Sequence, residues 1–293
     1  MVQKGLIMNK KNIAIFLHSY KNKNLLENIK KLYESSSDAA NLFFFVYDQS
    51  NINRSKDFID FHNLVYTHVR WDEYFGIPYY RKQVIQKRFD YFLEISDQVE
   101  LIKKWDKHLI DFIESKGDII ISGKGKTNIF VNEFVLNKNE EDRKDFYLNN
   151  WIDMNFIFLS KNNIDSFLSV DFLKYYGQDL ALLLDFVSKN ISIYSCPSNF
   201  YLINKKNNLE DMFVSYDLYH NYNFIIKKIK DNKVKLSMIE KQHAIDLTKI
   251  KLLPFENIDV SYNALSASFE NNNDLNRFYD NFNSIKLKEK ING

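Results

Sequence analysis

The chain has 293 residues, 45% of them hydrophobic, so it can bury one large core, or one core plus a smaller lobe. Its 40 Lys and Arg against 38 Asp and Glu leave a formal charge of +2, which excludes a global field strong enough to hold a polyanion. The single cysteine, Cys196, excludes an internal disulfide framework and any metal site built from several cysteines.

No stretch approaches the roughly 20 apolar residues that span a bilayer. The segment Met1–Asn12 also lacks the apolar stretch of a signal peptide. We therefore expect a soluble, cytoplasmic protein without a membrane span.

The first part of the chain alternates short apolar runs with amphipathic stretches. The predicted elements, in chain order, are strand Asn12–Tyr20, helix Leu25–Ser35, strand Leu42–Gln49, a short helix Ser55–His62, strand Leu64–Val69, helix Pro78–Arg88 and strand Tyr91–Asp97. This alternation predicts an α/β fold with a mostly parallel sheet flanked by helices.

The pattern continues beyond Lys103 and then changes. A helix with Trp105 and Leu109 on one face is followed by predicted strands Asp118–Ser122, Asn128–Leu136 and Trp151–Ser160, helix Asp179–Lys189 and strand Ile191–Cys196. From about Lys205, longer helical patterns such as Tyr216–Lys230 alternate with Asn-rich turns. We predict an α/β domain over residues 1–204 and a mainly helical C-terminal lobe over residues 205–293.

Ligands of such sheets bind beyond the carboxyl ends of the strands, so the residues that end the strands are the first candidates for a site. They are Ser19, Tyr20, Asp48, Gln49, Ser96, Asp97 and Gln98. Acidic oxygens at a strand end can hold a divalent ion against a diphosphate, and Asp97 is the natural candidate, with Gln98 and Glu100 as helpers. Acidic residues also form turns at strand ends, so Asp97 alone does not distinguish a site from a turn.

Other motifs are incomplete. Gly123–Thr127 ends like a phosphate-binding P-loop, but the leading glycine would fall at Ile120, and an apparent strand follows instead of a helix. No Gly-x-Gly-x-x-Gly occurs, and the six histidines form no His-x-x-x-His pair. The sequence thus argues against a nucleotide triphosphatase, a dinucleotide enzyme and a histidine-based zinc site.

Four stretches occur in the order of a known family. They are Ile13–Tyr20 with Leu25, Leu26, Ile29 and Leu32, continuing to Asp48-Gln49; Gly76–Arg81; Tyr91–Gln98 with Trp105-Asp106 and Leu109-Ile110; and Tyr176–Leu182 with Ile193–Pro197. They resemble that family's opening strand and helix, its Gly-Pro-x-x-Ala-Arg segment, its strand ending in Asp-Ser-His, and its Gly-Glu-Glu helix with the next strand. The family is that of GT-A glycosyltransferases, which includes the cytoplasmic N-acetylglucosaminyltransferases acting on hydroxyproline.

The resemblance implies a GT-A-like fold and a hexosyl- or N-acetylhexosaminyltransferase. The donor would be a nucleotide diphosphate sugar, most simply a UDP-sugar, bound by residues 1–204 as the catalytic domain. The acceptor would be a hydroxyl on a protein, a glycan or a hydroxymethylated DNA base, and no residue distinguishes among these.

The resemblance also implies roles for individual residues. Donor-binding residues would be Ser19, Tyr20, Asp48, Arg81 and Ser96; Mn²⁺ or Mg²⁺ would be held by Asp97 and Gln98; Gln178 and Asp179 would be catalytic. The Arg81 guanidinium suits diphosphate oxygens, although Arg81 could also be a helix-surface residue. Asp179 could equally be a helix cap.

The chain departs from the family at the metal site. Ser96-Asp97-Gln98 stands where the family has Asp-Ser-His, and no histidine follows Cys196-Pro197, where Asn199 and Asn204 lie nearby. The ion would then be held more weakly, held differently or lost. The alternative function is a non-catalytic GT-A-fold protein that binds a sugar nucleotide, a glycan or nucleic acid, the last suggested by the pairs Lys10-Lys11 and Lys205-Lys206. We expect Trp105 in the core and Asp106 in a local helix or turn contact.

Overall fold

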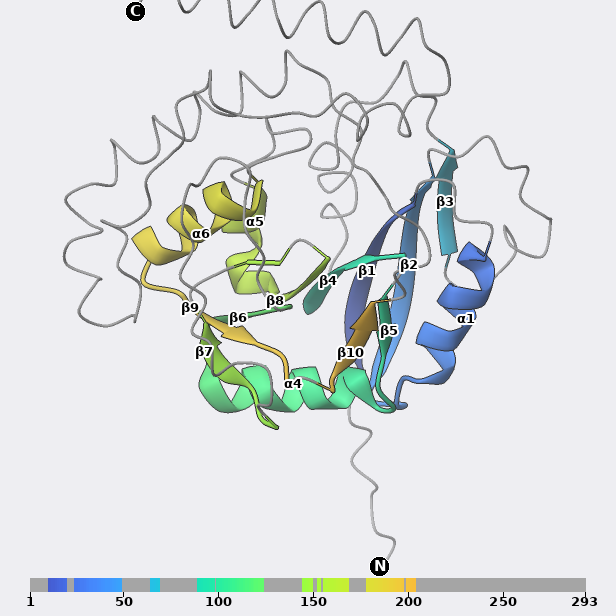
Figure 1. Ribbon diagram of the computed structural model, residues 1–293, viewed down its shortest axis with the longest axis horizontal. Coiled ribbons are helices and arrows are strands. Elements are labelled where there is room, and N and C mark those ends of the chain that lie inside the picture. Colours follow the sequence, from blue (N-terminus) through green and yellow to red (C-terminus); the bar gives the residue numbers. More distant parts are fainter. Residues whose placement is uncertain are drawn as a thin grey trace, which may run out of the picture.

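The computed structural model of the chain describes residues 10–19, 24–48, 64–68, 89–97, 99–123, 144–149, 152–153, 155–168, 178–197 and 199–203. These residues form an eight-stranded sheet in the order β3-β2-β1-β4-β8-β6-β9-β7 and a two-stranded sheet of β10 and β5 (Figure 1). The strands are β1 Lys11–Ser19, β2 Ala40–Asp48, β3 Leu64–His68, β4 Tyr91–Ser96, β5 Val99–Leu101, β6 Ile119–Ser122, β7 Tyr147–Asn149, β8 Phe156–Ser160, β9 Ser192–Ser195 and β10 Tyr201–Ile203. The helices are α1 Leu25–Glu34, α4 Trp105–Lys116, α5 Ile164–Leu168 and α6 Gln178–Ser188, with a 3-10 turn at Lys161–Asn163.

The predicted elements that fall on described residues are present, with their ends shifted by a few residues. The predicted helices at residues 55–62 and 78–88, the predicted strand at 128–136 and the predicted lobe from residue 205 lie outside the described residues. The sequence patterns did not indicate the three-residue strands β5, β7 and β10 or the short helix α5.

The sheet is mixed in direction. β1 pairs in parallel with β2 and with β4, and parallel pairing also joins β2 to β3 and β6 to β9. β8 runs antiparallel to both β4 and β6, and β7 runs antiparallel to β9. Because β8 is reversed, it begins at the same edge of the sheet at which β4 ends.

The predicted strand Trp151–Ser160 was wrong in its first half, because strand β8 begins only at Phe156. The side chain of Asp153 accepts a hydrogen bond from the main-chain N–H of Asn155, 2.9 Å away. This Asx turn bends the chain before the strand starts. A residue that the sequence placed in a strand therefore lies in a turn at the sheet edge.

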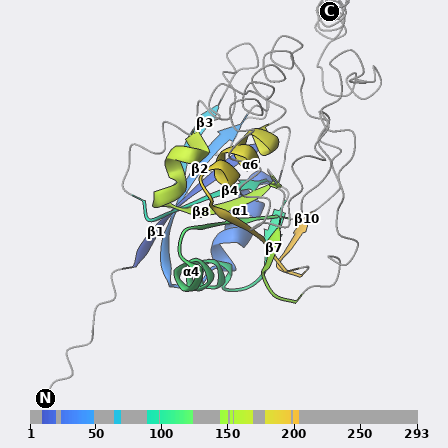
Figure 2. The same cartoon turned by 90° about the vertical axis from the view of Figure 1, so that its left-hand side faces the viewer.

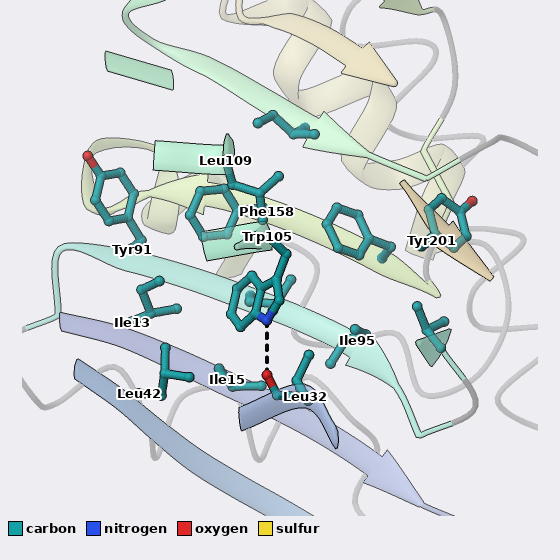
Figure 3. Close-up of a cluster of buried hydrophobic side chains, with 14 of the residues drawn as sticks. Ile13, Ile15, Leu32, Leu42, Tyr91, Ile95, Trp105, Leu109, Phe158 and Tyr201 are labelled. Carbon is teal, nitrogen blue, oxygen red and sulfur yellow. Dashed lines mark hydrogen bonds between the residues drawn. The ribbon is translucent and has the colours of Figure 1, made fainter. Parts of the chain in front are cut away.

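Helices cover both faces of the sheet, which explains why its strands are continuous apolar runs. Figures 1 and 2 show α4 on one side and α5 and α6 on the other. On the α4 side, one buried cluster joins the sheet to α1 and α4, and Trp105 lies within it (Figure 3). On the other side, Phe167 of α5 packs on Phe92 of β4, with ring centroids 5.3 Å apart.

Trp105 and Asp106 connect α4 to the segment around the end of α1. The indole Nε1 of Trp105, which is fully buried, donates a hydrogen bond of 3.0 Å to the carbonyl oxygen of Leu32 (Figure 3). Asp106 accepts hydrogen bonds from the main-chain N–H and the hydroxyl of Ser37, at 2.6 and 2.9 Å. The core position predicted for Trp105 is confirmed. Asp106 makes a turn contact, as predicted, but the contact is not local, because the turn follows α1 and lies 69 residues away in the sequence.

Trp105→Phe should lower the free energy of unfolding by about 2 kcal/mol, because it removes the indole hydrogen bond to the Leu32 carbonyl and opens space beside α1. The hydroxyl of Ser35, 3.1 Å away, remains as the second donor to that carbonyl. Urea unfolding followed by circular dichroism measures this change. A loss under about 0.5 kcal/mol would show that this hydrogen bond contributes little.

Candidate functional site

The carboxyl ends of four parallel strands lie level at one edge of the sheet. In the register, Ser19 of β1 pairs with Asp48 of β2, and Asp48 pairs with His68 of β3. On the other side of β1, His18 pairs with Ser96 of β4, so Asp97 follows at the level of Ser19. Adjacent strands lie about 4.8 Å apart, so Asp97, Ser19 and Asp48 span about 10 Å along this edge.

The polar side chains of this edge are buried. Ser19 and Asp48 are fully buried and Asp97 is 2% exposed, whereas Ser96 is partly exposed. Asp48 accepts a hydrogen bond of 3.2 Å from the hydroxyl of Tyr66, and the carbonyl oxygen of Asp97 accepts one of 2.7 Å from Asn28 of α1. An acidic residue that merely forms a turn is ordinarily exposed. The burial of Asp97 therefore favours a site over a surface turn.

The hydroxyl oxygen of Ser19 is buried and has no hydrogen-bond partner among the described residues. Buried polar atoms nearly always have a partner, because burial removes their hydrogen bonds to water. Such an atom at the carboxyl edge of a parallel strand is what a ligand-binding edge would contain before its ligand is bound.

A second polar cluster continues along the same edge, beside β4. The main-chain N–H of Ser96 donates to the carbonyl oxygen of Asn155, 2.9 Å away. Asp153, which is 5% exposed, accepts from the main-chain N–H and the side-chain amide of Asn155, at 2.9 and 2.7 Å, and from the hydroxyl of Tyr201, at 3.2 Å. The sequence analysis missed Asp153. The pattern Asp153-x-Asn155 before an apolar run is the signal that would have indicated its turn.

Gly123 and Cys196 lie next to this cluster. A Cβ atom at position 123 would come within 2.6 Å of both Asp153 Oδ2 and the Tyr201 hydroxyl, so a larger residue there would have to push this hydrogen-bonded pair aside. Gly123 thus has a packing reason that is unrelated to a phosphate-binding loop. Burial, and secondly the carboxylate of Asp153, raise the pKa of the Cys196 thiol, which argues against a nucleophilic role.

The structure brings together four of the predicted site residues, Ser19, Asp48, Ser96 and Asp97. The predicted residues Tyr20, Arg81 and Gln98 lie outside the described residues. Gln178 and Asp179 are the first two residues of α6, and their side chains are not described. Their assignment to the site stays a prediction.

The described residues supply few ligands for a metal ion. Among them, no group of three or more His, Cys, Asp and Glu side chains is placed to hold one. Mg²⁺ is commonly bound through one or two carboxylates together with substrate phosphates. The carboxylate of Asp97, with no third ligating side chain grouped around it among the described residues, fits an ion shared with a diphosphate better than an ion held by protein ligands alone.

Comparison with known proteins identifies the class of fold. The crystal structure of GalNAc-T7 with UDP, GalNAc and Mn²⁺ is similar to this chain, with a TM-score of 0.57 and 10% sequence identity. The match covers 76% of this chain and 49% of GalNAc-T7, so the chain spans about half the length of that protein. At this identity the likeness shows the fold alone, and the GT-A-like α/β fold predicted from the sequence is confirmed.

No protein-family model matches the sequence, and no curated protein matches it. The narrower resemblance to the hydroxyproline N-acetylglucosaminyltransferases therefore stays a prediction. Within the part of the chain that is described, no helix is long and apolar enough to span a membrane.

Comparing two buried serines at strand ends, Ser19 and Ser195, tests whether the Ser19 hydroxyl serves the fold or a ligand. Ser195 is also fully buried, but its hydroxyl donates to the carbonyl oxygen of Gly123 at 2.9 Å. Ser195→Ala should lower the free energy of unfolding by about 1 kcal/mol, whereas Ser19→Ala should leave it unchanged or raise it, because no hydrogen bond is lost. Thermal and urea unfolding of both variants make the comparison. An equal loss in both would mean that the Ser19 hydroxyl contributes to the fold.

Proposed function

We propose that the protein is a glycosyltransferase that moves a sugar from a nucleotide diphosphate sugar, a UDP-sugar first of all, to an acceptor hydroxyl. One observation carries the proposal: Ser19, Asp48 and Asp97 form a level row of buried polar groups at the carboxyl edge of a GT-A-like sheet. In open α/β sheets this edge is where ligands bind. GalNAc-T7, which shares the fold, was crystallised with UDP, GalNAc and Mn²⁺.

The three side chains suit different parts of such a donor. Asp48 and Ser19 offer an acceptor and a donor of hydrogen bonds for the hydroxyl and ring groups of a nucleoside. Asp97 offers the carboxylate through which Mn²⁺ or Mg²⁺ would be held next to the diphosphate. When bound, the ion would neutralise the charge that develops on the leaving diphosphate. Arg81 would add a second positive charge for the same oxygens.

The beginning of α6 supplies the residues that we assign to transfer. Asp179 would hydrogen-bond the donor sugar or orient the acceptor hydroxyl, and Gln178 would assist it. The chemistry of the described residues does not distinguish a protein, a glycan or a hydroxymethylated base as the acceptor. A second candidate function, sugar-nucleotide binding without turnover, is favoured by the change of the family's Asp-Ser-His to Ser96-Asp97-Gln98.

Asp97→Asn should remove most of the metal-dependent part of donor binding, because an amide is a far poorer ligand for a hard cation than a carboxylate. Calorimetric titration with UDP, with and without MnCl₂, measures this effect. Asp106→Asn is the matched control, since Asp106 is also a buried aspartate but contacts only the fold around Ser37 in the described contacts. It should lower stability and leave the Mn²⁺ dependence unchanged.

The proposal fails if the wild-type protein binds no nucleotide or nucleotide sugar in a panel tested with Mn²⁺. If Asp97→Asn keeps the wild-type response to Mn²⁺, the ion is held elsewhere. Binding without any transfer or hydrolysis would favour the second candidate function.

Asp179→Asn should slow sugar transfer by about 2–4 kcal/mol in the barrier and change donor affinity far less, because a positioned polar group acts mainly in the transition state. Asn caps a helix about as well as Asp, so a mere capping role predicts little change. Transfer rates and donor affinity of this variant separate the two roles. Near-wild-type turnover would identify Asp179 as a cap only.

A further inference from the structure

The turn at Asp97 joins β4 to β5, and each of these strands contacts a segment whose side chains hydrogen-bond to Asp153. Before the turn, the main-chain N–H of Ser96 at the end of β4 donates to the carbonyl oxygen of Asn155. After the turn, β5 pairs with β10, with Leu101 opposite Tyr201. Figure 1 shows β5 and β10 side by side. Neither pairing by itself links the two sides of the turn.

Asp153 makes that link with its two carboxylate oxygens. Oδ1 accepts from the main-chain N–H and the side-chain amide of Asn155, at 2.9 and 2.7 Å. Oδ2 accepts from the hydroxyl of Tyr201, at 3.2 Å. One buried side chain thus holds the partner of β4 with one oxygen and the partner of β5 with the other.

The surroundings of Asp153 hold the carboxylate in one place. Its main-chain N–H donates to the buried hydroxyl of Ser122, at 2.7 Å. Gly123 leaves just enough room for the carboxylate and the Tyr201 hydroxyl, as any side chain there would collide with both. The ring of Tyr201 stacks on Phe156, the first residue of β8, with centroids 5.7 Å apart. Such a saturated, buried network is rigid, because each member limits the movement of the next.

We propose that Asp153 is a positioning residue of the donor site, which holds the Asp97 turn in place by its two flanking strands, through Asn155 and through Tyr201. This inference rests on the proposed function in one respect, the use of Asp97 by the donor. On the opposite side, Asn28 of α1 holds the carbonyl oxygen of Asp97 and Lys31 of α1 pairs with Glu100 of β5, at 3.1 Å. The turn at Asp97 is therefore held on one side by contacts with α1 and on the other side by the hydrogen bonds of Asp153.

The chain offers a closely matched control for the Tyr201 contact. Tyr91 is also buried in the core cluster, its hydroxyl donates to a carboxylate, Glu114, at 3.0 Å, and its ring stacks on a phenylalanine of β8, Phe158. Figure 3 shows Tyr91 and Tyr201 at opposite ends of the cluster. Tyr91→Phe and Tyr201→Phe each remove one hydroxyl from a tyrosine–carboxylate pair, but only Tyr201 contacts the Asp153 network.

The experiment compares these two variants by hydrogen exchange of the main-chain amides in residues 96–101, without any nucleotide. Tyr201→Phe should speed exchange there roughly tenfold, and Tyr91→Phe should not change it. Tyr91→Phe should also lower thermal stability less, because Glu114 is half exposed whereas Asp153 is buried. Asp153→Asn should produce the same local change, and combining it with Tyr201→Phe should add little to it, because both variants alter the hydrogen bond between Asp153 and Tyr201. Equal exchange in the two tyrosine variants would overturn the proposal.

Binding of UDP with MnCl₂ tests the link to the donor. Tyr201→Phe should weaken it roughly tenfold and Tyr91→Phe should leave it unchanged, a difference that a purely structural role for Tyr201 does not produce. Unchanged binding by Tyr201→Phe, with faster exchange, would overturn the role in the donor site. If the wild-type protein binds neither UDP nor any other nucleotide or nucleotide sugar with Mn²⁺, the proposed function fails, while the exchange measurement still decides whether Asp153 holds the turn.

Discussion

β1 hydrogen-bonds to β2 on one side and to β4 on the other, in parallel on both, and this pairing decides where the polar groups of the site lie. Each of these strands packs apolar side chains of different shapes against both faces, so a slip by one residue would disrupt the packing on both faces at once. The register that satisfies the core also brings Ser19, Asp48 and Asp97 to one level. The positions of these three side chains thus follow from the packing of the sheet.

The helices on the α4 side keep the sheet in that register. Trp105 hydrogen-bonds to Leu32 in the last turns of α1, and Asp106 hydrogen-bonds to Ser37 in the segment that joins α1 to β2. Asn28 of α1 in turn binds the carbonyl oxygen of Asp97. The contacts of Trp105 and Asp106 are therefore connected to the Asp97 edge of the sheet through α1. This connection explains why Asp106, although buried and acidic, serves the fold and does not take part in the site.

The antiparallel strand β8 brings a second group of polar residues to this edge of the sheet. Since β8 starts where β4 ends, the turn at Asp153 and Asn155 lies beside Ser96. In a purely parallel sheet, Asp153 and Asn155 would lie at the opposite edge. The mixed direction of the sheet therefore extends the row of polar groups from β1, β2 and β4 toward β6 and β10.

The sequence by itself determined the order of the main strands and helices and the strand-end residues Ser19, Asp48 and Asp97, because continuous apolar runs and helical spacing are local properties of the chain. It could not show that Asp97 is buried, since an acidic residue after a strand has the same local pattern in a turn and in a site. Only the tertiary structure decided that β8 is antiparallel, that Asp106 reaches Ser37, and that Asp153 meets Tyr201. These contacts join residues far apart in the sequence, and their partners are chosen by how whole elements pack, which no short window of sequence records.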